Sequence, residues 1–73
     1  MKKVYRMQNL DCANCAAKME RAIQKIAGVN SASVSFMAQK LVIEMDDDKV
    51  ADIMQQASKC VEKVDSGCKI LGI

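Results

Sequence analysis

The apolar residues at the start of the chain follow two different periods. Residues 3–8 (KVYRMQ) alternate and predict a strand whose inner face carries Tyr5 and Met7. From about Cys15 the apolar positions recur every three or four residues, which predicts a helix that Gly28 closes. The apolar face of this helix comprises Ala16, Met19, Ala22 or Ile23, and Ile26.

The middle of the chain returns to a period of two. Residues 30–36 (NSASVSF) and residues 41–45 (LVIEM) predict two strands joined by a turn at 37–40. We expect the acidic residues 46–48 to cap a second helix. The inner faces of the two strands are expected to carry Ala32, Val34 and Phe36 on the former and Leu41, Ile43 and Met45 on the latter.

A second helical stripe and a short apolar segment complete the pattern. The stripe comprises Val50, Ile53, Met54, Ala57, Val61 and Val64. Residues 68–73 (CKILGI) then predict a last strand. The order strand, helix, strand, strand, helix, strand is that of the ferredoxin-like βαββαβ fold. This α+β fold has a four-stranded antiparallel sheet with both helices on one face. We expect residues 1–73 to form a single domain.

Composition narrows the functions open to such a domain. The net charge is +2 and the lysines are scattered among acids, so we expect no nucleic acid partner. No apolar run reaches the roughly 18 residues of a membrane span, and the first ten residues lack the features of a secretory signal. We therefore expect a soluble, cytoplasmic monomer, either free-standing or part of a longer membrane protein.

The sequence contains four cysteines and no histidine. Reduced thiols are expected outside an oxidising compartment, and without imidazole any metal must be held by sulfur or oxygen. The stretch QNLDCANCAAKMER places Cys12 and Cys15 between a strand and a helix. A thioredoxin-like redox site has the same placement, but such domains are larger and oppose a proline to the disulfide. This chain has no proline.

Two metal-binding interpretations of the pair remain. A structural zinc site needs four closed ligands, usually as two close pairs, whereas the other cysteines, Cys60 and Cys68, are eight positions apart. The other interpretation is an open, exchangeable site for a soft metal ion. Cys15 lies in the first turn of the predicted helix, whose positive end favours the thiolate that binds metal. Two ligands leave coordination positions free, which suits transfer of the ion, and we favour this interpretation.

The stretch NLDCANCAAKMERAIQKIAGV resembles the metal-binding motif of the heavy-metal-associated domain, and the resemblance covers essentially the whole chain. That family has the βαββαβ fold and includes copper chaperones and the cytosolic N-terminal domains of P-type ATPases that transport heavy metals. Its members usually have Gly and Met where this chain has Asn9 and Leu10, and Leu10 can provide the same apolar anchor. The resemblance implies that Cys12 and Cys15 are the metal ligands.

Asp11 bears on which metal is bound. Zn(II) accepts a mixed set of sulfur and carboxylate ligands, and Cd(II) and Pb(II) are expected to accept it too. Cu(I), in contrast, needs only two sulfur ligands. The motif DCxxC therefore resembles that of the zinc, cadmium and lead exporters of the family, with Asp11 as a third ligand. The alternative is that Asp11 merely caps the helix, which would begin near Ala13 or Asn14.

Two further residues are secondary candidates for the site. In this fold the loop before the last strand approaches the motif, which makes Cys68 a candidate ligand. Some cadmium-type members of the family have an acid in this loop, and Asp65 is the nearest one here. We favour structural roles for both, a small buried residue and a turn former respectively. Cys60 is expected in the core or at its boundary. The methionines are expected to lie on apolar faces or in the turn rather than bind copper; they are Met7, Met19, Met37, Met45 and Met54.

These features predict a metal-binding module rather than an enzyme. It would bind Zn(II), Cd(II) or Pb(II) and deliver the ion to, or regulate, a metal-exporting P-type ATPase. The membrane and catalytic regions of that ATPase would lie outside this chain. A free-standing copper(I) chaperone is the alternative within the family, and a small thiol oxidoreductase is the alternative from another class of protein.

Overall fold

The computed structural model describes residues 1–72 of the chain. Its elements follow the predicted order, with one short 3-10 helix added before the second α-helix. They are β1 (Lys2–Gln8), α1 (Ala13–Gln24), β2 (Val29–Ser35), β3 (Lys40–Met45), η1 (Asp47–Lys49), α2 (Val50–Val64) and β4 (Lys69–Ile70). Ile73, the last residue of the predicted final strand, lies outside the described residues.

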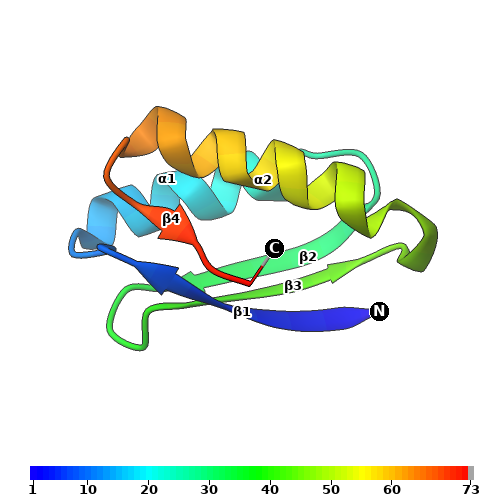
Figure 1. The fold of residues 1–73 in the computed structure, drawn as a ribbon, viewed down its shortest axis with the longest axis horizontal. Coiled ribbons are helices and arrows are strands. Elements are labelled where there is room, and N and C mark those ends of the chain that lie inside the picture. The colour runs from blue at the N-terminus through cyan, green and yellow to red at the C-terminus, as the bar shows by residue number, and fades with distance from the viewer. Residues whose placement is uncertain (73) are drawn as a thin grey trace.

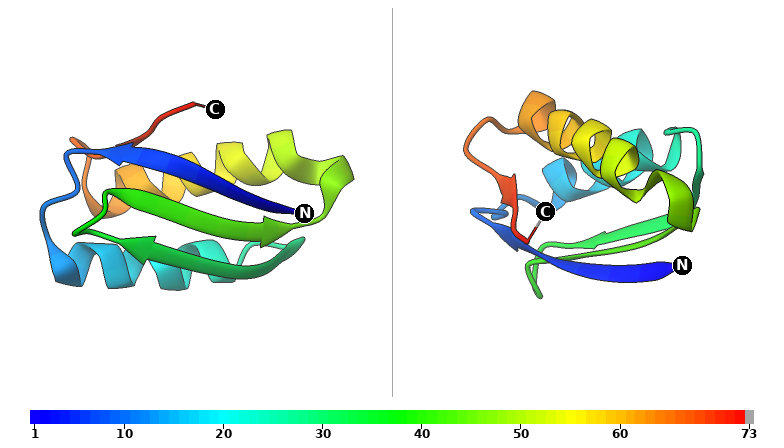
Figure 2. Two further views of the ribbon diagram at one scale, coloured as in Figure 1. Left: turned by 90° about the horizontal axis from the view of Figure 1, so that it is seen from below. Right: turned by 45° about the vertical axis from the view of Figure 1, so that its right-hand side comes forward.

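The four strands form one antiparallel sheet in the order β2-β3-β1-β4. Both helices cover the same face of this sheet (Figure 1). Figure 2 shows the same two layers from other sides, with the short β4 beside the end of β1. The predicted ferredoxin-like fold is thereby confirmed. Neither α-helix within residues 1–72 has the length and apolar character needed to cross a membrane.

The core lies between the sheet and the helices and is almost wholly aliphatic. Methionine side chains fill much of it, because their flexibility lets them occupy irregular space. No polar or charged side chain of residues 1–72 is buried. The buried side chains of the strands are Tyr5, Met7, Ala32, Val34, Leu41, Ile43, Met45 and Ile70. Those of the helices are Ala16, Met19, Ile23, Ile53, Met54, Ala57 and Val61.

Three element ends differ from the sequence-based expectation. β2 ends at Ser35, so the predicted inward position of Phe36 is wrong, and this side chain is 38% exposed. The alternation continues in the sequence after the backbone has turned out of the sheet. α1 ends at Gln24, before Gly28, because the next two N–H groups bond carbonyls only three residues back. β4 comprises only Lys69–Ile70 of the predicted strand.

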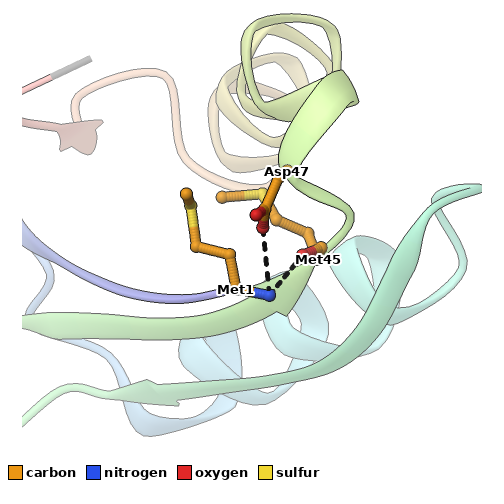
Figure 3. Close-up of polar contacts among 3 residues, drawn as sticks. All are labelled: Met1, Met45 and Asp47. Carbon is orange, nitrogen blue, oxygen red and sulfur yellow. Dashed lines mark hydrogen bonds and ion pairs between the residues drawn. The ribbon is translucent and has the colours of Figure 1, made fainter.

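The acidic residues before α2 do not cap it with a side chain. Asp46 is the N-cap residue of η1, but its carboxylate makes no capping hydrogen bond. Asp47 forms an ion pair with the N-terminal amine of Met1 at 3.3 Å. That amine also donates a hydrogen bond to the carbonyl of Met45 at 2.9 Å (Figure 3). The carboxylates therefore lie at the positive end of a helical segment, and one of them also holds the N-terminus.

Candidate metal centre

Cys12 and Cys15 bracket the first turn of α1. Cys12 is the N-cap residue, with an extended backbone at φ −130° and ψ 119°. Its Sγ accepts a hydrogen bond from the N–H of Cys15 at 3.2 Å, which satisfies one of the free amides of the first turn. Both thiols are half-buried and neither forms a disulfide. The start of α1 follows directly on the loop after β1 (Figure 1), and both cysteines belong to this end of the helix.

The thiol of Cys12 occupies the capping role that was the alternative for Asp11. Asp11 precedes the N-cap residue, and its side chain is exposed. The capping alternative is therefore wrong. The capping residue must be the one that directly precedes the first helical residue, and Cys12 has that position. The N-cap hydrogen bond of α1 is accepted by Cys12 and not by the carboxylate of Asp11.

The two thiols have opposite pKa shifts. The hydrogen bond with the Cys15 side chain, together with the Cys15 amide, lowers the pKa of Cys12 below its ordinary value. The same side-chain hydrogen bond, together with partial desolvation, raises the pKa of Cys15. The first proton therefore leaves Cys12, and its thiolate is stabilised by the neighbouring thiol and by an amide at the helix N-terminus. Binding of a metal ion to both sulfurs would release the remaining proton.

Residues 9–12, which join β1 to α1, form the motif loop. The two residues before Asp11 attach this loop to the rest of the domain. Leu10 is 1% exposed, so it provides the apolar anchor expected of it. Asn9 has a φ of +62°, and its Nδ2 donates a hydrogen bond to the carbonyl of Gly67 at 3.1 Å. Glycine adopts this left-handed conformation readily, and asparagine does so better than most other residues. This backbone conformation explains why asparagine is acceptable where the family pattern has glycine.

The loop before β4 contains the two secondary candidates. Asp65 ends α2, where its Oδ1 accepts a hydrogen bond from the N–H of Gly67 at 3.0 Å. Its carbonyl accepts one from the N–H of Cys68 at 3.1 Å, so Asp65 has the bonds of a turn former. Cys68 is fully buried, and burial raises its pKa, with the charges of Asp65 and Asp11 adding to the effect. Cys60 is half-buried on α2 and packs against the core.

The two carboxylates act on the thiols without joining them in one ligand cluster. The charge of Asp11 opposes the lowering of the Cys12 pKa by hydrogen bonds. The charge of Asp65 adds to the raising of the Cys15 pKa by its hydrogen bond with Cys12. Within residues 1–72, however, no three histidine, cysteine, aspartate or glutamate side chains are close enough to hold one metal ion. Cys12 and Cys15 form an open pair of sulfurs, and such a donor set suits soft or borderline ions.

Gln39 supports the motif loop, and the sequence pattern did not indicate it. It lies in the turn between β2 and β3, with a φ of +54°. Its Oε1 accepts a hydrogen bond from the N–H of Leu10 at 3.0 Å, and its Nε2 donates one to the carbonyl of Leu10. The two residues are 29 positions apart. No period or spacing relates the two loops, so the sequence contained no signal for this contact.

The sequence is similar to those of known metal-handling proteins. The sequence matches the family model of the heavy-metal-associated domain over residues 4–68. The zinc/cadmium/lead-transporting P-type ATPase of Shigella sonnei (strain Ss046) is 39% identical over 59 residues, which cover 81% of this chain and 8% of the ATPase. The cadmium, zinc and cobalt-transporting ATPase of Bacillus subtilis (strain 168) is 32% identical over 65 residues, covering 89% and 9%. The chain thus spans less than a tenth of the length of these relatives.

Solved structures show the same fold. The CopZ metallochaperone has a TM-score of 0.75 at 27% identity, and the match covers 97% of this chain and 100% of CopZ. A copper binding domain from HMA7, a P-type ATPase, has a TM-score of 0.71 at 25% identity, covering 97% and 93%. Oxidized MerP from Ralstonia metallidurans CH34 shares the fold at 21% identity, with a TM-score of 0.74 over 99% and 97%. With its family pattern, its fold and its paired thiols, this chain belongs to the heavy-metal-associated domain family, whose members are metal-binding modules.

Proposed function

We propose that this domain binds a divalent soft metal ion through Cys12 and Cys15, and delivers it to, or regulates, a metal-exporting P-type ATPase. The observation that carries the proposal is the pair of half-buried thiols at the start of α1, in which Cys12 Sγ accepts the amide hydrogen bond of Cys15. The lowered pKa of Cys12 provides a thiolate for the first metal bond. Two ligands leave coordination positions free for an acceptor to take over the ion.

Asp11 is the proposed third ligand, and it sets the choice of metal. Its side chain is exposed, so the carboxylate can rotate towards an ion without disturbing the core. A carboxylate oxygen adds negative charge that Zn(II) uses well, and we expect Cd(II) and Pb(II) to use it also, whereas Cu(I) gains little. The substrates in the names of the two ATPases support this choice. Asp65 and Cys68 keep structural roles, because the turn and the core engage them.

The larger setting of the domain is inferred from those relatives. The metal ion is cargo, so the domain needs no catalytic residue of its own. ATP hydrolysis and the membrane passage of the ion would belong to segments outside this chain, as the small share of each ATPase that it matches indicates. In that setting the domain is a monomeric module on the cytosolic side of the transporter.

Competition for metal between the reduced protein and chelators tests the proposal. Under anaerobic conditions, Zn(II) and Cu(I) affinities are compared for the wild type, Asp11→Ala and Asp48→Ala. Asp48 is a matched control because it lies in η1, at the end of the molecule away from the thiols (Figure 1). We expect Asp11→Ala to weaken Zn(II) binding at least tenfold, about 1.4 kcal/mol, and to leave Cu(I) binding unchanged. Equal Zn(II) affinity in the wild type and Asp11→Ala would remove Asp11 from the ligand set.

A copper(I) chaperone is the second candidate function, and the similarity to CopZ and to the HMA7 domain favours it. In the same titration, a preference of the wild type for Cu(I) that Asp11→Ala does not alter supports this candidate. A disulfide-reduction assay on insulin distinguishes a thiol oxidoreductase from a metal-binding module. Turnover approaching that of thioredoxin would contradict the binding module, because a metal-transfer site needs no catalysis of disulfide exchange.

A further inference from the structure

We propose that Gln39 is a positioning residue for the metal site, acting through the backbone of Leu10. The inference rests on the proposed function in one respect, because it takes Cys12 and Cys15 as the ligands. Gln39 is not a ligand itself. Its amide holds the residue two positions before Cys12, so it decides how well the first thiol is placed before a metal ion arrives.

The side chain of Gln39 satisfies both polar groups of one backbone residue. Its Oε1 accepts from the N–H of Leu10 at 3.0 Å, while its Nε2 donates to the Leu10 carbonyl. A primary amide that bonds the N–H and the carbonyl of the same residue reproduces the paired hydrogen bonds of an antiparallel ladder. The motif loop lies outside the sheet, yet this contact joins it to the sheet in the manner of a β-bridge.

The turn that carries Gln39 is itself held by the sheet. The carbonyl of Gln39 accepts a hydrogen bond from the N–H of Met7 at 2.8 Å, and the N–H of Ala38 donates to Ser35 Oγ at 3.3 Å. Figure 2 shows this turn and the motif loop side by side at one end of the molecule. Glycine would adopt the positive φ of position 39 without strain. The bonds to Leu10 give a reason for a long amide there instead.

Loss of this contact would affect the loop more than the fold. Leu10 keeps its buried side chain and Asn9 keeps its bond to Gly67, so the loop stays attached at two points. Gln39 borders a hollow of about 330 Å³, whereas Leu10 is 1% exposed, so the freed N–H and carbonyl of Leu10 have to shift to reach water. The backbone before Cys12 then has more freedom, and metal binding has to order it. The expected result is weaker metal binding by a protein that is still fully folded.

The test compares Gln39→Met with Gln56→Met. Methionine matches glutamine in length, remains a non-glycine residue at positive φ, and cannot make either bond to Leu10. Gln56 is exposed on α2 and serves as the matched control. We expect Gln39→Met to raise the hydrogen-exchange rate of the Leu10 amide at least tenfold in the metal-free protein. The Zn(II) affinity of Gln39→Met should fall about tenfold, while the exchange rate of its Ile43 amide stays within twofold of wild type. For Gln56→Met, the exchange rate of the Leu10 amide and the Zn(II) affinity should both stay within twofold of wild type.

Each readout can overturn the positioning role. An unchanged Leu10 amide would show that the side chain does not hold the loop. Faster exchange with unchanged Zn(II) affinity would show a structural contact only. If Gln39→Met does not fold, Gln39→Asn replaces it, because that amide is one methylene too short to reach both groups of Leu10 and should show the same two changes. If the wild type binds no Zn(II), Cd(II) or Cu(I), the proposed function fails. The positioning role is then overturned as well, even if the exchange measurement shows that Gln39 holds the loop.

Discussion

The two ends of the domain hold the chain by different means. At the end away from the thiols, opposite charges meet: the amine of Met1 contacts the carboxylate of Asp47 at 3.3 Å and donates to the Met45 carbonyl (Figure 3). An ion pair is suitable at this end, because we propose no ligand-binding group there.

At the end with the thiols, neutral amides take the same role. Gln39 bonds the backbone of Leu10, and Asn9 bonds the carbonyl of Gly67. A cationic support beside the thiols would pair with the thiolate, and an extra carboxylate would compete for the metal ion. Amides hold the loop without either effect. The side-chain supports of residues 9 and 10 are therefore neutral, while the charged groups near the thiols, Asp11, Asp65 and Lys18, act on the thiol pKa values.

The largest effect is expected when a sulfur is removed and its hydrogen bond is kept. Cys12→Ser retains a side-chain acceptor at the N-cap, so the free energy of unfolding should change by less than about 1 kcal/mol. Zn(II) affinity should fall at least 1000-fold, about 4 kcal/mol, because a hydroxyl is a poor ligand at neutral pH. Chelator competition and urea unfolding measure the two effects. Retention of wild-type affinity would contradict the assignment of Cys12 as a ligand.

Asn9 tests whether the amide support at the thiol end contributes to stability. Asn9→Ala loses the bond to Gly67 and places a less tolerant residue at φ +62°. We expect the free energy of unfolding to fall by about 1–2 kcal/mol. Asn9→Gly loses the same bond but relieves the backbone, so its loss should be smaller. Urea unfolding of both variants gives the comparison, and an equal loss in the two would exclude a role for the backbone conformation.

The opposite pKa shifts of the thiols predict different reactivity towards iodoacetamide. The thiolate is the reactive form, and the pKa of Cys12 is lowered while that of Cys15 is raised. Alkylation of Cys12 in the metal-free protein should therefore begin at lower pH than that of a free cysteine, and alkylation of Cys15 at higher pH. Mass spectrometry of digested samples assigns each site. Cys68, which is fully buried, is the internal control and should remain unmodified. The reverse order of the first two would contradict the hydrogen bond between them.

The smallest effect is expected at the charged end. Asp47→Ala removes an ion pair between two exposed groups, so the free energy of unfolding should fall by less than about 1 kcal/mol. The difference from wild type should shrink as salt is added, because exposed charges are screened. Zn(II) affinity should not change. A change in affinity would show that the two ends are coupled through the fold.

Much of the fold could be predicted from the sequence, because a helix or strand that is buried on one side has apolar residues at regular intervals. The alternation around Tyr5 and Ile43 and the stripe around Ala57 were enough to order the elements. The same signal failed at element ends. Phe36 continues the alternation of β2 although the backbone has already turned, and the final strand is shorter than its apolar residues indicate. Hydrophobicity reports which residues are apolar, and the backbone hydrogen bonds decide where an element stops.

For the site, the two thiols, their spacing and the acid before them could be predicted directly, since these are properties of adjacent residues. The remaining features come from the folded structure. It made Cys12, not Asp11, the helix cap, and buried Cys68 away from solvent. It also brought Gln39 to Leu10 across 29 positions. A contact between two loops depends on where the sheet carries each of them, and no local pattern records that distance.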